Sequence, residues 1–144
     1  MATVQIMLLG CGKMGSAMLE GWLADPGLNA QFTIIEPYAE HLGWAGAQQQ
    51  VAIHSNCDAA IAAGTPVSAV IVLAVKPQMM DEAIAELGPL RDDKTAFLTI
   101  AAGIATSWLK ARLGAHTPVL RAMPNTPAAI GKGVTALYYD SAVA

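Results

Sequence analysis

Three glycines near the amino terminus have the spacing Gly-x-Gly-x-x-Gly, and they follow an apolar segment from Val4 to Leu9. Gly10 would allow a tight turn after a strand, Gly12 would leave the backbone open to a pyrophosphate, and Gly15 would let a helix pack closely on the strand. A helix that begins here directs free N–H groups and the positive end of its dipole toward phosphates. The pattern predicts a dinucleotide site; the alternative is a glycine-rich turn with a purely structural task.

An acidic residue follows the glycines at the distance that this kind of site requires. Glu36 comes about 20 residues after Gly15 and directly after the segment Phe32 to Ile35, which is typical of a strand. In a dinucleotide fold, a carboxylate at this position accepts hydrogen bonds from the adenosine ribose hydroxyls. The alternative is a solvated acid at the end of a strand.

Glu36 also bears on the choice of cofactor. A 2′-phosphate beside this carboxylate would meet like charge, with a repulsion of about 4 kcal/mol per unit charge at 4 Å and an effective dielectric of about 20, before screening. The next residues are Pro37, Tyr38 and Ala39, and none of them is an Arg or Lys that could hold a phosphate. We therefore expect NADH to be preferred over NADPH.

Composition narrows the class of protein. The chain has 144 residues, of which 54% are hydrophobic and 13% charged, as expected for one globular domain with a large core. The net charge of −3 and the lack of a basic tract argue against nucleic-acid binding. Cys11 and Cys57 have no metal or redox spacing, so we expect reduced thiols and no metal site. No signal peptide or membrane span is predicted, because the run from Val67 to Val75 is too short, and a cytoplasmic location is expected.

Strand and helix patterns alternate along the chain. After the first two strands, further strands are predicted at 51–53, 68–75, 96–100, 118–123 and 134–138, and helices after Gly15 and at 41–50, 80–87 and 107–113. Another helix begins after Ser55 and Asn56, which are candidate caps. This alternation predicts an α/β fold of Rossmann type, with a doubly wound, mostly parallel sheet and helices on both faces.

Ligands of such sheets bind beyond the carboxyl ends of the strands. The strand at 68–75 ends in Lys76, Pro77 and Gln78, so this segment should face the same crevice as the glycine loop. Lys76 is either a cofactor contact or a lysine that only solubilises the strand end. Small residues, Ala101 to Gly103, follow the next strand and would allow a flat ring or a ribose to approach.

Four blocks in this order resemble the N-terminal half of pyrroline-5-carboxylate reductase: Leu9–Gly15, Leu73–Gln78, Ile100–Ile104 and Arg121–Pro127. The last three are more specific than the glycine loop. The resemblance covers essentially the whole chain. It implies that a cyclic imine, 1-pyrroline-5-carboxylate, is reduced to L-proline in the last step of proline biosynthesis, with hydride from NAD(P)H.

The resemblance also implies roles for individual residues, without identifying a catalytic residue. The pyrophosphate would lie on the glycine loop, Gly10, Cys11, Gly12, Lys13, Met14 and Gly15, and the adenosine side would lie near Asn56. The ribose and nicotinamide would lie along the end of the fourth strand, at Ala74, Val75, Lys76 and Pro77, with Ala101, Ala102 and Gly103 nearby. The imine would lie in a pocket next to the nicotinamide, at Met123, Pro124 and Asn125.

Two features depart from the family pattern. Many members have a small polar residue and a nearby Arg after the second strand, where this chain has Glu36, Pro37 and Tyr38, so the frequent use of NADPH is in doubt. The family continues into a C-terminal helical domain that forms a homodimer and contributes substrate-binding groups. We expect residues 1–144 to form one NAD(P)-binding domain without that second domain, and to bind dinucleotide with little or no activity alone.

Two other functions remain open. One is a cofactor-binding module without catalysis. The other is a different small-substrate reductase with a similar first domain, such as a 3-hydroxyacid dehydrogenase or an F420-linked NADP reductase. The segments Val75–Gln78 and Met123–Pro127 argue against the second alternative. The oligomeric state of this chain is not predicted.

Overall fold

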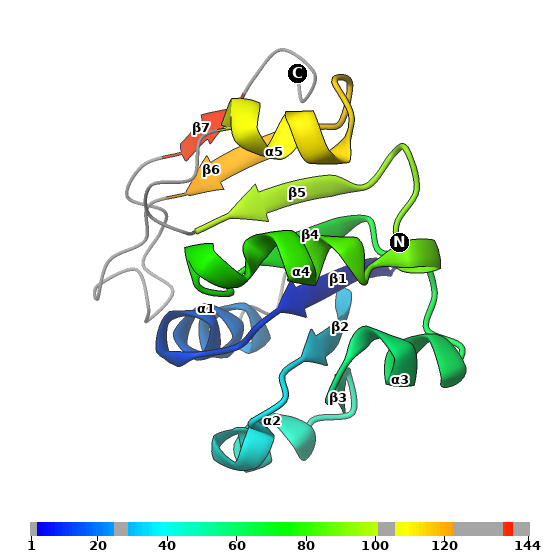
Figure 1. Ribbon diagram of the computed structural model, residues 1–144. Coiled ribbons are helices and arrows are strands. Elements are labelled where there is room, and N and C mark those ends of the chain that lie inside the picture. Colours follow the sequence, from blue (N-terminus) through cyan, green and yellow to red (C-terminus); the bar gives the residue numbers. More distant parts are fainter. Residues whose placement is uncertain (1–2, 25–28, 101–105, 123–136, 140–144) are drawn as a thin grey trace.

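The described residues of the protein form one seven-stranded sheet (Figure 1). The computed structural model describes residues 3–24, 29–100, 106–122 and 137–139. The strand order is β3-β2-β1-β4-β5-β6-β7; the first six strands in the sequence pair in parallel, and β7 pairs antiparallel with β6. The strands are β1 Val4–Leu9, β2 Ala30–Ile35, β3 Val51–His54, β4 Val70–Leu73, β5 Ala96–Thr99, β6 Val119–Ala122 and β7 Leu137–Tyr139.

The helices are short apart from α1 and α5. The α-helices are α1 Lys13–Leu23, α2 Gly43–Gly46, α3 Cys57–Ala62, α4 Met80–Ala85 and α5 Thr106–Leu113; the 3₁₀ helices are η1 Ala39–Leu42, η2 Pro77–Met79 and η3 Gly88–Leu90. The prediction of a helix over residues 41–50 is therefore wrong in length, because the α-helix there covers only Gly43–Gly46. Its middle holds Gly43 and Gly46, each of which costs about 1 kcal/mol relative to Ala in a helix. The segment forms a 3₁₀ turn and a single α-turn instead.

Helices cover both faces of the sheet. Alternate strand residues point to opposite sides, so Met7 and Leu9 pack with α3, α4 and α5, whereas Leu8 packs with α1, η1 and α2. The same alternation separates Ile71 from Val72 in β4, and all these side chains are almost completely buried. Burial on both sides explains why β4 is apolar throughout and β1 is apolar from Ile6 to Leu9. The expected fold class, a doubly wound and mostly parallel sheet, is confirmed.

The parallel strands end along one line. Leu9 of β1 is in register with Ile35 of β2 and with Leu73 of β4, and these two are in register with His54 and Thr99. In Figure 1 the arrowheads of β1, β5 and β6 accordingly point to the same side of the molecule. The chain leaves β1 with β2 on one flank and β4 on the other, which is the topological switch point where ligands of open α/β sheets bind.

No helix in the described part of the chain is long and apolar enough to cross a membrane.

Candidate functional site

The turn after β1 has a conformation that requires glycine. Gly10 has a φ of +87°, and its N–H donates to the carbonyl of Ile35 at 2.8 Å. A Cβ at Gly10 would lie 2.7 Å from Cγ1 of Val75 and 3.0 Å from the backbone N of Val75. Both the left-handed conformation and the close approach of the β4 segment exclude a side chain. The expected tight turn off the strand is confirmed.

The amino end of α1 is open. Gly12 is the N-cap residue, no side chain in the described part of the chain caps this end, and the first turn contains no acidic residue. Gly12 is exposed, and no atom of the described residues other than its chain neighbours lies within 4 Å of the position that a Cβ would take. An 11-residue helix with an uncapped amino end and free space above its N-cap glycine fits a phosphate group. Lys13 and Met14 begin the first turn of this helix.

Gly15 differs from the other two glycines. A Cβ there would lie 3.5 Å from Cβ of Ala74 and 3.6 Å from the carbonyl oxygen of Gly10, which are ordinary contact distances. The helix does pack against the residue after β4, as expected, but the space would also admit an alanine.

Glu36 fastens the glycine loop to the end of β2. Its Oε1 accepts the N–H of Cys11 at 2.9 Å, and its Oε2 accepts the N–H of Tyr38 at 3.1 Å. The side chain is half-buried, and its own N–H donates to the carbonyl of His54 at 2.9 Å. Each carboxylate oxygen has a further lone pair, so the group can accept hydrogen bonds from ribose hydroxyls while it holds the loop.

The segment after β4 lies against the same loop. The N–H of Ala74 donates to the carbonyl of Leu9 at 2.9 Å, and Val75 contacts Gly10 as described above. Lys76 is exposed and is the N-cap residue of η2, which begins at Pro77. The structure thus brings Ala74–Pro77, Glu36 and the glycine loop to one edge of the sheet.

Asn56 caps α3 beyond the end of β3. Its Oδ1 accepts the N–H of Ala59 at 2.7 Å, which confirms the expected cap. Because the side chain is exposed, its amide NH₂ group is available in addition for the adenosine side of a ligand. Ala101, Ala102 and Gly103, and likewise Met123, Pro124 and Asn125, lie outside the described residues.

Neither Cys11 nor Cys57 is in a disulfide, and both side chains are buried. Burial raises the pKa of the Cys11 thiol, and the nearby Glu36 charge raises it further, against the lowering effect of a hydrogen bond with Ser16. Burial, with smaller effects of Glu86 and Asp58, raises the pKa of the Cys57 thiol to about 11. The two thiols are therefore neutral at neutral pH and unsuited to act as nucleophiles.

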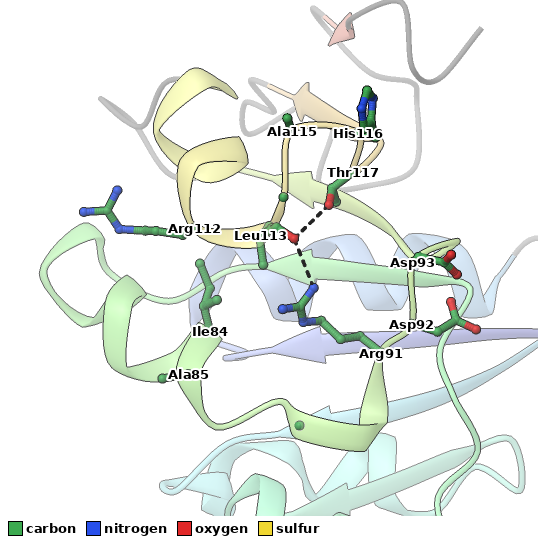
Figure 2. Close-up of a pocket in the computed structure, with 12 residues that line it drawn as sticks. Ile84, Ala85, Arg91, Asp92, Asp93, Arg112, Leu113, Ala115, His116 and Thr117 are labelled. Carbon is green, nitrogen blue, oxygen red and sulfur yellow. Dashed lines mark hydrogen bonds between the residues drawn. The ribbon is translucent and has the colours of Figure 1, made fainter.

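A hollow of about 640 Å³ lies on the opposite side from the glycine loop, beside the amino ends of β5 and β6 (Figure 2). It is lined by the ends of α4 and α5 and by the turns that precede β5 and β6. The carbonyl oxygen of Leu113, at the end of α5, accepts bonds there from Arg91 at 3.4 Å and from the hydroxyl of Thr117 at 3.0 Å. The carboxyl ends of α4 and α5 carry partial negative charge, and the lining contains both cations, Arg91 and Arg112, and acids, Asp92 and Asp93, so the charge of this hollow is mixed.

The glycine loop, its acid and its position in the sheet suit a dinucleotide-dependent oxidoreductase. A family model described as "NADP oxidoreductase coenzyme F420-dependent" matches residues 5–103. The chain belongs to this family. The match contains the glycine loop, Glu36 and the end of β4.

Known relatives extend the similarity to nearly the whole chain. The pyrroline-5-carboxylate reductase of Pseudomonas aeruginosa is 34% identical over 144 residues, which cover 99% of this chain and 51% of that protein. A solved pyrroline-5-carboxylate reductase of Coxiella burnetii is 25% identical and superposes with a TM-score of 0.80 over 99% of this chain and 52% of its own. The Plasmodium falciparum enzyme, solved with NADP bound, has a TM-score of 0.71 at 20% identity, over 96% of this chain and 48% of its own, and this likeness concerns the fold alone.

These findings confirm the resemblance that the four sequence blocks indicate. The chain spans about half the length of the curated relatives that it matches.

The sequence did not reveal how the acid is used within the fold. Glu36 is predicted as a ribose ligand, whereas the structure shows it bonded to Cys11 and Tyr38 as well. Backbone partners of this kind leave no pattern of residue types. In the sequence, Tyr38 matters only as a residue that is not an Arg or Lys. The signal that could have pointed to its bond with Glu36 is that the two residues are only two positions apart.

Proposed function

We propose that this chain supplies the cofactor-binding part of an NAD(P)H-dependent reductase that converts 1-pyrroline-5-carboxylate to L-proline. The observation that carries the proposal is the extent of the similarity. The family model stops at residue 103, but the match to the Pseudomonas reductase covers 99% of the chain, including the block Arg121–Pro127. A general oxidoreductase domain would not need to resemble this one enzyme beyond the end of the family model.

The residues present fit a nicotinamide dinucleotide. The uncapped amino end of α1 and the open space above Gly12 suit the pyrophosphate, Glu36 suits the ribose, and Ala74–Pro77 continue along the edge toward the nicotinamide. The bound cofactor supplies the hydride. A protonated cyclic imine is already an electrophile, so the task of the chain is to hold the two reactants in a fixed orientation.

Charge at the end of β2 supports NADH as the preferred cofactor. The carboxylate of Glu36 is held in place by two backbone N–H groups, so it cannot readily turn away from a 2′-phosphate. The next three residues offer no compensating cation. The relative from Plasmodium was solved with NADP bound, which supports the class of cofactor but not this preference.

The rest of the proposal concerns setting and assembly. Two buried thiols that form no disulfide suit a reducing compartment, and we place the enzyme in the cytoplasm. We expect the 144-residue chain to bind cofactor and to produce little or no proline by itself, because the family's second half, which makes the homodimer, contributes substrate-binding groups.

A chimera tests the proposed reaction. The chain replaces the matching half of the Pseudomonas reductase, and proline formation from 1-pyrroline-5-carboxylate is measured with NADH as the reductant. We expect proline formation well above that of the isolated chain, and its loss in the same chimera with Gly12→Ala. A chimera that binds NADH and forms dimers but makes no proline would contradict the proposal.

The family description favours one second candidate, hydride exchange between NADP and coenzyme F420. The same chimera, and the chain alone, are assayed for NADPH-dependent reduction of F420. We expect none, because the similarity to pyrroline-5-carboxylate reductases extends past the family model.

A further inference from the structure

Tyr38 is conspicuous for its exposure. Among the described residues, the other large hydrophobic side chains that are more than a third exposed lie between 37% and 49%, whereas Tyr38 is 76% exposed. Single exposed apolar side chains are common and by themselves need no explanation. The inference that follows rests on how the backbone of Tyr38 is held.

The backbone of Tyr38 is tied to the glycine loop through one carboxylate. Oε2 of Glu36 accepts the N–H of Tyr38 at 3.1 Å, and Oε1 accepts the N–H of Cys11 at 2.9 Å. Pro37, between the two, has a fixed φ, which removes further freedom. Tyr38 is also the N-cap residue of η1. The position from which the ring projects is therefore fixed relative to the loop that would hold the pyrophosphate.

The order of groups in a dinucleotide indicates which part of the cofactor would lie near Tyr38. With the pyrophosphate on the glycine loop and the ribose on Glu36, the adenine lies beyond the ribose on the side away from the loop. That direction runs past the end of β2 toward β3, since these strands are neighbours and Ile35 is in register with His54. Tyr38 follows β2 and Asn56 follows β3 on this edge.

We propose that the ring of Tyr38 is the platform on which the adenine of the cofactor stacks. This inference rests on the proposed function and adds a binding residue to it. The π-face of a base stacks on an aromatic side chain, and the ring needs no hydrogen bond from its hydroxyl to do so. Glu36 has a positioning task here: it sets the ring relative to the phosphate loop as well as binding the ribose.

Isothermal titration of four forms of the chain tests the platform: wild type, Tyr38→Ala, Tyr38→Phe and Trp44→Ala. Trp44 is a matched control, since it is an aromatic side chain that is 40% exposed. The ligands are NADH, ADP-ribose, which keeps the adenine, and nicotinamide mononucleotide, which lacks it. The melting temperature of each form is measured in parallel.

We expect Tyr38→Ala to bind NADH and ADP-ribose roughly 5- to 100-fold more weakly than wild type and nicotinamide mononucleotide unchanged. Tyr38→Phe and Trp44→Ala should bind all three as wild type does, with melting temperatures unchanged in the two Tyr38 variants and lowered in Trp44→Ala, whose side chain is partly buried. The platform is overturned if Tyr38→Ala binds ADP-ribose as wild type does, if Tyr38→Phe loses as much as Tyr38→Ala, or if all three ligands weaken equally. Failure of wild type to bind NADH and ADP-ribose would instead refute the proposed function.

Discussion

At the scale of single residues, the three glycines of one motif have different physical tasks. Gly10 is required by its backbone conformation and by the approach of Val75, whereas among the described residues nothing near Gly12 requires a glycine, and Gly15 is required by neither conformation nor space. The open position at Gly12 is what the proposed dinucleotide would explain. The spacing predicts a separate task for each position; the structure confirms the turn at Gly10 and shows that the space at Gly15 would also admit an alanine.

Alanine substitutions separate these tasks. Gly10→Ala should lower the free energy of unfolding by about 2–4 kcal/mol, through a strained φ and a clash with Val75. Gly12→Ala should change stability by less than about 0.5 kcal/mol, yet weaken NADH binding roughly tenfold or more, because its methyl group enters the pyrophosphate path. Gly15→Ala, the control, should be neutral or slightly stabilising, since alanine favours the helix. Chemical denaturation and calorimetric titration measure both quantities. Loss of stability in Gly12→Ala equal to that in Gly10→Ala would contradict this assignment.

The charge of Glu36 is predicted to set the cofactor preference. Glu36→Gln removes the charge, but its amide oxygen can still accept the N–H of Cys11. We expect the ratio of NADPH to NADH affinity to rise roughly tenfold, after allowance for screening by salt, with a loss of stability below about 1 kcal/mol, because the Gln NH₂ group cannot accept the N–H of Tyr38. Glu36→Ala should in addition lose about 1 kcal/mol of stability, because the loop amide loses its acceptor. Titration of each variant with both cofactors measures the ratio, and an unchanged ratio in Glu36→Gln would remove the electrostatic explanation.

At the scale of elements, the sequence predicts the strands better than the short helices. β4 is a continuous apolar run and β1 is apolar from Ile6 to Leu9, and this pattern arises directly from burial on both faces. The segment 41–50 has a weak helical pattern interrupted by Gly43 and Gly46, and it forms less helix than predicted. Leu137 and Tyr138 of the strand predicted at 134–138 lie in β7, which extends to Tyr139, and residues 134–136 lie outside the described part of the chain.

Asn56 has a task in its own helix as well as a predicted one in the site. Asn56→Ala should lower the free energy of unfolding by about 1 kcal/mol, since Ala59 loses its cap acceptor. Asn56→Asp keeps an acceptor for the cap and should retain stability, while it loses the amide donors that could reach the adenosine. Weaker NADH binding in Asn56→Asp at unchanged stability would support the binding role. If Asn56→Asp binds NADH with the affinity of wild type, Asn56 acts only as the cap of α3 and not as a cofactor ligand.

At the scale of the whole molecule, the register of the parallel strands makes the site. Loops that are far apart in the sequence, after β1, β2 and β4, meet at one edge because Leu9, Ile35 and Leu73 end their strands in the same row. The strand and helix pattern predicts this convergence, since carboxyl ends of parallel strands share an edge. The backbone bonds of Glu36 and the exposure of Tyr38 are not predicted, because they depend on the local path of the chain rather than on the pattern of residue types.

The central claim is that the switch point of this sheet is a dinucleotide site with a preference set by Glu36. The most direct test is calorimetric titration of the chain with NADH and, separately, with NADPH at one salt concentration. We predict saturable binding of both with one site per chain, and tighter binding of NADH. Tighter binding of NADPH would contradict the role given to the charge of Glu36, and absence of binding for both would contradict the site itself.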